Sequence, residues 1–180
     1  LESLPFSSGT FDIVAGFNSF QYAGNFTNAL SEAKRVLKTG GRLVIGIWDK
    51  PEYSDATTIL KAINSLVPPP PPGTPGPFAL SEDGKIESIC TALKLKVIYK
   101  IRIACPFLYH TTDEGIKSFL GTGPAAAAMK HASELKVHQT IAEALQPYRL
   151  TEDMYHLQNS FPLIKFNRIF ILYNTIYYSC

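Results

Sequence analysis

The sequence predicts an α/β fold, a partial Rossmann-like doubly wound sheet, because strand, helix and strand patterns follow one another near its start. Residues 11–17 form a short apolar run of the kind found in parallel strands buried on both faces. Residues 26–37 repeat apolar side chains every three or four positions, which gives a helix one buried face. After a Gly40-Gly41 turn, residues 42–48 form a second apolar strand. Such a βαβ unit joins parallel strands through a right-handed crossover.

The rest of the chain continues this alternation. The proline run over residues 68–77 can be neither helix nor central strand, because proline lacks an N–H and has a fixed φ. Residues 96–105 alternate apolar and polar side chains as a strand does, and strand character returns from Tyr148 onward. We expect the last strands to be antiparallel, and residues 55–77 with 110–145 to form a helical lid. Further helices are expected over residues 55–67, 81–93, 111–120 and 125–145.

Composition excludes several classes of protein. An apolar fraction of 46% and a charged fraction of 18% are typical of a globular domain rather than a disordered chain. The net charge is only +2 and the basic residues are scattered along the sequence, so neither nucleic acid nor an anionic membrane is an expected partner. Three widely spaced cysteines suggest neither a disulfide framework nor a zinc site, and no apolar run is long enough to span a membrane. We therefore expect a cytoplasmic protein.

Two segments carry a resemblance to a known family. The first segment is similar to the stretch before and through the fourth strand of class I S-adenosylmethionine-dependent methyltransferases. It consists of residues 1–6, a turn and then Phe11-Asp12-Ile13-Val14. Residues 29–43, with Glu32, Arg35 and Gly40-Gly41, resemble the family's helix-turn-strand signature. This sequence has Thr39 at the position where the signature usually has proline. Three further segments resemble those of a type 11-like, small-molecule subgroup: the proline loop running into residues 78–81, the Gly121–Pro124 turn and residues 155–161. Residues 155–161 resemble the final antiparallel strand of that subgroup.

The resemblance implies that residues 1–161 are the C-terminal part of a methyltransferase domain. The family's glycine-rich cofactor turn and its acidic ribose-binding residue would precede Leu1, and no glycine triplet elsewhere in this sequence replaces them. Residues 162–180 do not resemble the family and are predicted to be a divergent hydrophobic tail. An altered reading frame, a retained non-coding stretch and a genuine extra strand remain open as its origin.

The implied function is methyl transfer from S-adenosylmethionine to a small-molecule acceptor, and whether this chain is active as it stands remains open. The alternative is a non-catalytic binding or regulatory paralogue, or a fragment, of a methyltransferase. A Rossmann-type dehydrogenase would explain the βαβ unit but not the signature over residues 29–43. An exposed edge of the parallel sheet also predicts an oligomer.

The candidate cofactor site follows the first strand, because ligands of such sheets bind at the carboxyl ends of the strands. Packing is the competing interpretation for the two phenylalanines there, and ordinary loop hydrogen bonding for the asparagine and glutamine. The resemblance adds the first two residues, on the adenine side of the pocket. The candidate cofactor-binding residues are Leu1, Glu2, Phe17, Asn18, Ser19, Phe20 and Gln21.

No catalytic residue can be named from the sequence. His131 and His138 could share a helix face, but no ligand set converges with them by spacing, so no metal is expected. His110 and Asp49 are weaker candidates for contact with the acceptor.

Overall fold

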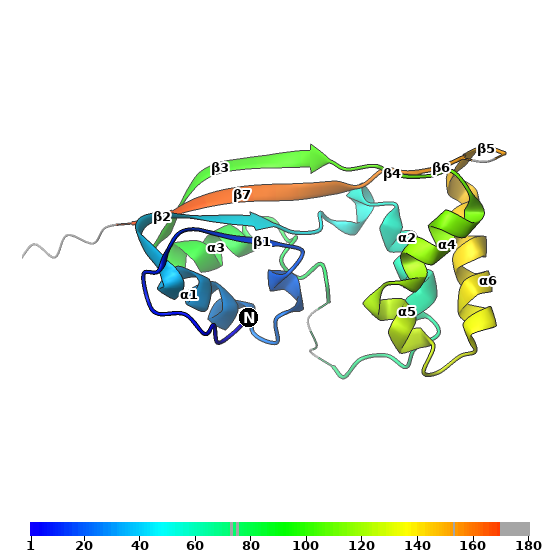
Figure 1. The fold of residues 1–180 in the computed structure, drawn as a ribbon, viewed down its shortest axis with the longest axis horizontal. Coiled ribbons are helices and arrows are strands. Elements are labelled where there is room, and N and C mark those ends of the chain that lie inside the picture. Colours follow the sequence, from blue (N-terminus) through cyan, green and yellow to red (C-terminus); the bar gives the residue numbers. More distant parts are fainter. Residues whose placement is uncertain (73, 75, 153, 170–180) are drawn as a thin grey trace, which may run out of the picture. The chain divides into compact units, whose positions relative to one another are not determined.

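The computed structural model describes residues 1–72, 74, 76–152 and 154–169, which form two compact units (Figure 1). The sheet unit comprises residues 1–47, 80–101 and the described residues from Pro162 onward. The helical unit comprises residues 48–79 and 102–161. Each unit has its own cluster of buried apolar side chains, so each is described separately.

The predicted βαβ unit is present in the sheet unit. Strand β1 (Phe11–Phe17) and strand β2 (Leu37–Gly46) are parallel, with helix α1 (Phe26–Val36) between them and a short 3-10 turn, η1 (Phe20–Tyr22), before the helix. The side chain of Asn25 caps α1 by accepting the N–H of Asn28 at 3.0 Å, which satisfies one of the helix's unpaired donors.

Helix α1 ends earlier than the apolar pattern predicts. Leu37 is fully buried but extended (φ −77°, ψ 136°), because it already pairs with Phe11 of β1. Lys38, the next residue, forms an ion pair with Asp12 at 2.9 Å. The chain reverses at Gly40, whose φ of +76° is a conformation that glycine adopts without strain.

The remaining strands complete a four-stranded sheet of order β1-β2-β7-β3. Helix α3 (Lys85–Ala92) leads into β3 (Leu95–Ala104), and β7 (Ser160–Arg168) runs antiparallel to β2. The expectation that residues 155–161 form the final antiparallel strand is wrong, since that strand begins at Ser160. Residues 162–168 of the predicted divergent tail therefore form an inner strand of the sheet, whereas residues 170–180 lie outside the described residues.

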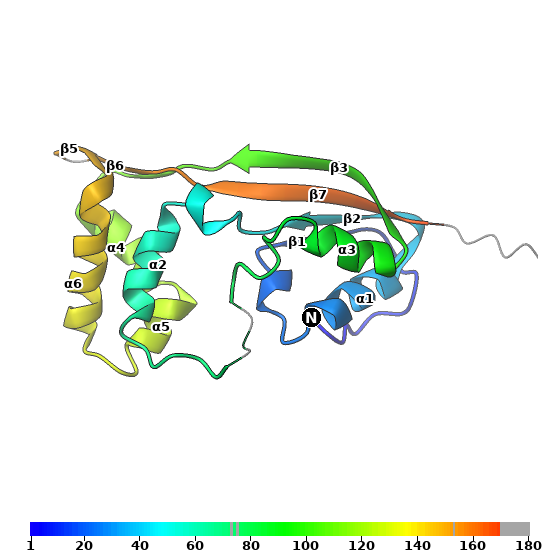
Figure 2. The same ribbon diagram turned by 180° about the vertical axis from the view of Figure 1, so that it is seen from behind.

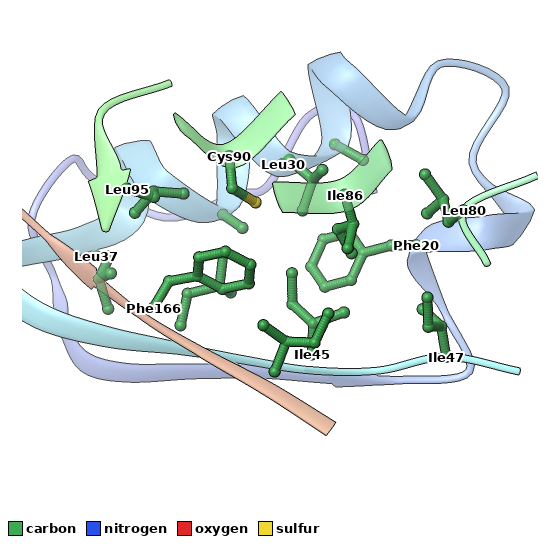
Figure 3. Packing of buried hydrophobic residues seen from close by; sticks show 14 residues of the cluster. Phe20, Leu30, Leu37, Ile45, Ile47, Leu80, Ile86, Cys90, Leu95 and Phe166 are labelled. Atoms are coloured by element: carbon green, nitrogen blue, oxygen red, sulfur yellow. The ribbon is translucent and has the colours of Figure 1, made fainter. Parts of the chain in front are cut away.

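The core of the sheet unit lies between the sheet and two helices. Helices α1 and α3 cover the same face of the sheet in both views (Figures 1 and 2). Side chains from these helices, including Leu30, Ile86 and Cys90, meet Ile45 and Phe166 from the strands (Figure 3). Burial raises the pKa of the Cys90 thiol to about 12, as expected for a packing cysteine rather than a nucleophile.

The helical unit combines four helices with a small sheet of order β4-β6-β5, against which α4 packs. Helix α6 packs against α2 and α4, and α5 packs against α2. The single helix predicted over residues 125–145 is two helices, because the chain leaves α5 at Ala128 and Ser133 caps a new helix. The elements are η2 (Pro51–Tyr53), α2 (Ala56–Asn64), β4 (Phe107–Tyr109), α4 (Thr112–Leu120), α5 (Gly123–Ala128), α6 (Glu134–Leu145), η3 (Gln146–Tyr148), β5 (Arg149–Thr151) and β6 (Met154–Leu157).

The predicted α/β class is confirmed, with parallel β1 and β2 followed by an antiparallel last strand. Within the described part of the chain, no helix combines the length and apolarity needed to cross a membrane.

Phe166 tests the importance of β7. Phe166→Ala removes a fully buried ring from the core of the sheet unit and should lower the free energy of unfolding by about 3–5 kcal/mol. Ile98→Ala, at a side chain 48% exposed on β3, should change it by less than about 0.5 kcal/mol. Urea denaturation followed by circular dichroism measures both, and equal effects would mean that β7 does not contribute to the core.

Candidate functional site

The chain turns sharply where β1 ends. The Phe17 side chain is 63% exposed, and its ring lies over Gly46 of β2, where an added Cβ would approach Cδ1 of the ring to 2.6 Å. Asn18 has a φ of +46°, which is uncommon for a residue other than glycine. Its N–H donates to the carbonyl of Gly46 at 2.8 Å, and its Oδ1 accepts the Gln21 side-chain amide at 3.1 Å. These bonds fix the turn at the carboxyl end of β1.

The next three predicted residues are less accessible. Phe20 is 4% exposed and belongs to the core, where its ring fills the space beside Gly16. Gln21 is 3% exposed, and its Oε1 is buried without a hydrogen-bond partner, as is the Oγ of Ser19. Buried acceptors are normally paired, so these two mark a polar site whose hydrogen bonds the protein itself leaves incomplete.

An N-terminal segment lies against α1 and carries Leu1 and Glu2. The Leu4 N–H donates to Glu32 at 3.0 Å, and Arg35 donates to the carbonyls of Leu4 and Phe6 at 3.1 and 2.8 Å. The hydrogen bonds from Arg35 and from the Leu4 N–H lower the pKa of Glu32 to about 2. Two residues of the sequence signature therefore hold the chain that precedes β1.

Of the first two residues, Glu2 has a defined contact. Its Oε1 accepts the N–H of Asn25 at 2.9 Å, near the start of α1, whereas Leu1 is 54% exposed. The structure thus brings Glu2 to the loop after β1, and sequence reasoning gave no signal for the Asn25 contact.

A second polar cluster lies in the helical unit around Asp49. This carboxylate is 2% exposed and accepts hydrogen bonds from Arg102, from the Ser160 hydroxyl at 2.6 Å and from the Lys50 N–H at 2.9 Å. Burial raises the pKa of Asp49, but these hydrogen bonds outweigh it and hold the pKa below its ordinary value. The guanidinium of Arg102 also lies 4.2 Å from the centre of the Tyr53 ring.

A cavity of about 450 Å³ adjoins this cluster. Its lining includes the ionisable side chains of Glu52, Asp55, Arg102 and His156. Asp55 is held in place because its Oδ2 accepts the Gln158 N–H at 2.7 Å. The size and polar lining suit a small molecule.

The two weaker candidates for contact with the acceptor, Asp49 and His110, lie in different surroundings. Asp49 is paired within the helical unit, while His110 is exposed and its N–H donates to Glu114 at 2.6 Å. Across the described residues, no group of three or more His, Cys, Asp or Glu side chains could hold a metal ion. The sequence analysis did not identify Arg102 or His156 as candidates. Their contacts with Asp49 and with the cavity join residues far apart along the chain, and no local pattern indicates such contacts.

Comparison with known proteins gives two kinds of match. Residues 1–45 match the family model of a methyltransferase domain. An uncharacterised protein of Methanocaldococcus jannaschii is 40% identical over 52 residues, which are 29% of this chain and 25% of that protein. The matched stretch is thus a quarter of the length of that relative.

Two solved structures share the fold. A methyltransferase candidate from Bacillus halodurans has a TM-score of 0.55 at 15% identity, covering 94% of this chain and 75% of that chain. The YcgJ protein of Bacillus subtilis has a TM-score of 0.53 at 19% identity, covering 94% and 69%. With the family match, this shared fold confirms the resemblance to class I methyltransferases.

Glu32 tests the attachment of the N-terminal segment. Glu32→Gln removes the charge that Arg35 binds, so the Leu4 amide should exchange hydrogen faster than in the unchanged chain. Because the folded pKa lies below the ordinary 4.5, the attachment is complete above pH 4.5 and is lost as the pH falls through about 2. Hydrogen exchange against pH checks this. Glu52→Gln, at an exposed carboxylate of the other unit, should leave Leu4 unchanged.

Asp49 tests the buried cluster. Asp49→Asn should lower the free energy of unfolding by about 1–3 kcal/mol, because it weakens charge-assisted hydrogen bonds to a buried acceptor. Asp12→Asn breaks an ion pair whose carboxylate is 81% exposed and should cost less than about 1 kcal/mol. The Asp49 effect should be full above pH 3.8 and should shrink as the pH falls through the lower folded pKa. Urea titrations across this pH range measure it, and a constant difference would contradict the proposed role of the charge.

Proposed function

We propose that this chain transfers a methyl group from S-adenosylmethionine to a small-molecule acceptor. Two findings support the proposal: the match of residues 1–45 to a methyltransferase-domain model, and the fold shared with a methyltransferase candidate. The single observation that carries the proposal is that the matched segment ends β1 in a fixed polar turn. That turn lies at the carboxyl end of a parallel strand, where ligands of such sheets bind.

The residues at this turn fit the adenosine part of S-adenosylmethionine. The exposed ring of Phe17 offers a flat apolar surface on which a base can stack. Ser19 and Gln21 carry buried acceptor atoms that lack partners, which suit amine or hydroxyl donors of a ligand once the loop admits it. We assign Leu1, Glu2 and Asn18 to the rim of the same site, and Phe20 to the packing beneath it.

Methyl transfer from S-adenosylmethionine requires few chemical groups of the protein. S-adenosylmethionine supplies a methyl group already activated on a sulfonium sulfur. The chain's own residues then have to hold the cofactor, align the acceptor in line with the methyl group and exclude water. The described residues identify no general base for this step.

We propose that the cavity of the helical unit binds a small molecule. Its volume of about 450 Å³ suits a small molecule, and Glu52, Asp55, Arg102 and His156 offer hydrogen bonds of both kinds. We further propose that residues 1–161 are the C-terminal part of a methyltransferase domain and that the protein is cytoplasmic. The rival proposal is a non-catalytic binding or regulatory relative, which would share the fold but not the binding of cofactor.

Calorimetry with S-adenosylmethionine and S-adenosylhomocysteine tests the cofactor site. Phe17→Ala should weaken binding by about 1–3 kcal/mol, or roughly 5- to 150-fold, because the stacking surface is lost. Ile98→Ala, on the other edge strand of the same sheet, is the matched control and should bind as the unchanged chain does.

The outcomes separate the two proposals. Binding of both ligands that depends on Phe17 supports the methyltransferase site and justifies a screen for acceptors with radiolabelled methyl groups. No binding at millimolar cofactor by a folded chain would overturn the proposal for this chain and favour the non-catalytic relative.

A further inference from the structure

Gly46, the last residue of β2, lies beside Phe17, the last residue of β1. The two residues are partners in the parallel register of these strands. The N–H of Asn18 donates to the Gly46 carbonyl at 2.8 Å, so the chain is also held to Gly46 immediately after Phe17. Gly46 is buried although it has no side chain of its own. The ring of Phe17 covers it.

That ring occupies the space that a side chain at position 46 would need. The three heavy atoms nearest to an added Cβ are Cδ1, Cε1 and Cγ of Phe17, at 2.6, 3.3 and 3.7 Å. Ordinary van der Waals contact begins only at 3.4 Å, so even the methyl group of alanine would push the ring from its place. These three atoms lie along one edge of the ring. The ring therefore rests on Gly46 by that edge, while the side chain stays 63% exposed.

The backbone conformation at position 46 does not require glycine. Among the described glycines, positive φ angles occur at Gly9, Gly40 and Gly84, so alanine fits the backbone of Gly46 without strain. Glycine inside a strand costs stability, and it often marks a place where another group approaches the backbone closely. At Gly46 the group that approaches is the ring of Phe17.

Gly16 has a similar relation to Phe20, but with a different consequence. An added Cβ on Gly16 would meet the Phe20 ring, which is 4% exposed and belongs to the core of the sheet unit. A close-packed core leaves that ring no space into which it can move. The Phe17 ring can instead move into solvent. A larger residue should therefore disturb the core at position 16 but only the orientation of Phe17 at position 46.

We propose that Gly46 is a positioning residue of the candidate cofactor site. By leaving room for the Phe17 ring, it holds the stacking surface in one orientation before the ligand arrives. A ring that is already in place loses less rotamer freedom when the ligand binds, which is the advantage of preorganisation. This inference rests on the proposed function, because the ligand that stacks on Phe17 is there S-adenosylmethionine.

Calorimetry with S-adenosylhomocysteine and urea denaturation of Gly46→Ala test the proposal together. Gly46→Ala should weaken binding roughly 2- to 12-fold, because the ring is no longer held in place. Its urea midpoint should not fall, since alanine restricts the unfolded chain more than glycine does. Gly123→Ala, in α5 where an added Cβ meets no atom within 4 Å, is the matched control and should bind as the unchanged chain does. Gly16→Ala should lower the urea midpoint.

The same substitution in a Phe17→Ala background shows whether Gly46 acts through the ring. Gly46→Ala should then have no further effect on affinity, because the side chain that it displaces is absent. A further loss of equal size in that background would overturn the proposal. So would Gly46→Ala binding as tightly as the unchanged chain, or a fall in its urea midpoint as large as that of Gly16→Ala.

Nuclear magnetic resonance of the unliganded chain separates a failure of this inference from a failure of the proposed function. Nuclear Overhauser contacts should join the ring protons of Phe17 to the α-protons of Gly46. Their absence in a folded chain would overturn the positioning by Gly46, whatever the chain binds. If the contacts are present but the unchanged chain binds neither cofactor nor product, the proposed function is wrong, and the role of Gly46 in binding is overturned with it.

Discussion

The pairing of β2 with strands on both sides is the interaction on which the sheet unit depends. β2 is parallel to β1 on one edge and antiparallel to β7 on the other, and Leu43 and Ile45 on its inner face are fully buried. β7 also closes the end of α1, because Arg168 donates hydrogen bonds to the carbonyls of Lys34 and Leu37. The Lys34 carbonyl also accepts the Leu37 N–H at the end of α1, and a cation at that end complements the helix dipole. One strand from the end of the chain thus completes both the sheet and the helix cap.

The order of the elements could be predicted wherever the signal was local. The apolar spacing of residues 26–37 predicted the helix that is observed as α1, and the helix predicted over residues 111–120 is observed as α4 with Thr111 as its N-cap. The end of α1 could not be predicted, since Leu37 leaves the helix to pair with Phe11, a contact across the sheet. Residues 162–168, for which a genuine extra strand was one of the origins left open, form part of an inner strand of the sheet. Their apolar, aromatic composition departs from the family pattern, but a central strand buried on its inner face needs just such side chains, as Ile164 and Phe166 show.

The sequence predicted where the candidate site lies in the sheet, but it did not predict which of its side chains are exposed. The rule that ligands bind at the carboxyl ends of strands identified the turn after β1, but it treats every residue of that turn alike. Packing separates them: Gly16 leaves a space that the ring of Phe20 fills, while the ring of Phe17 lies over Gly46 and stays exposed. Asp49 was a sequence candidate, but its partners had no sequence signal, because Arg102 and Ser160 are 53 and 111 residues away along the chain. Contacts of that range are set by the fold and not by the local pattern.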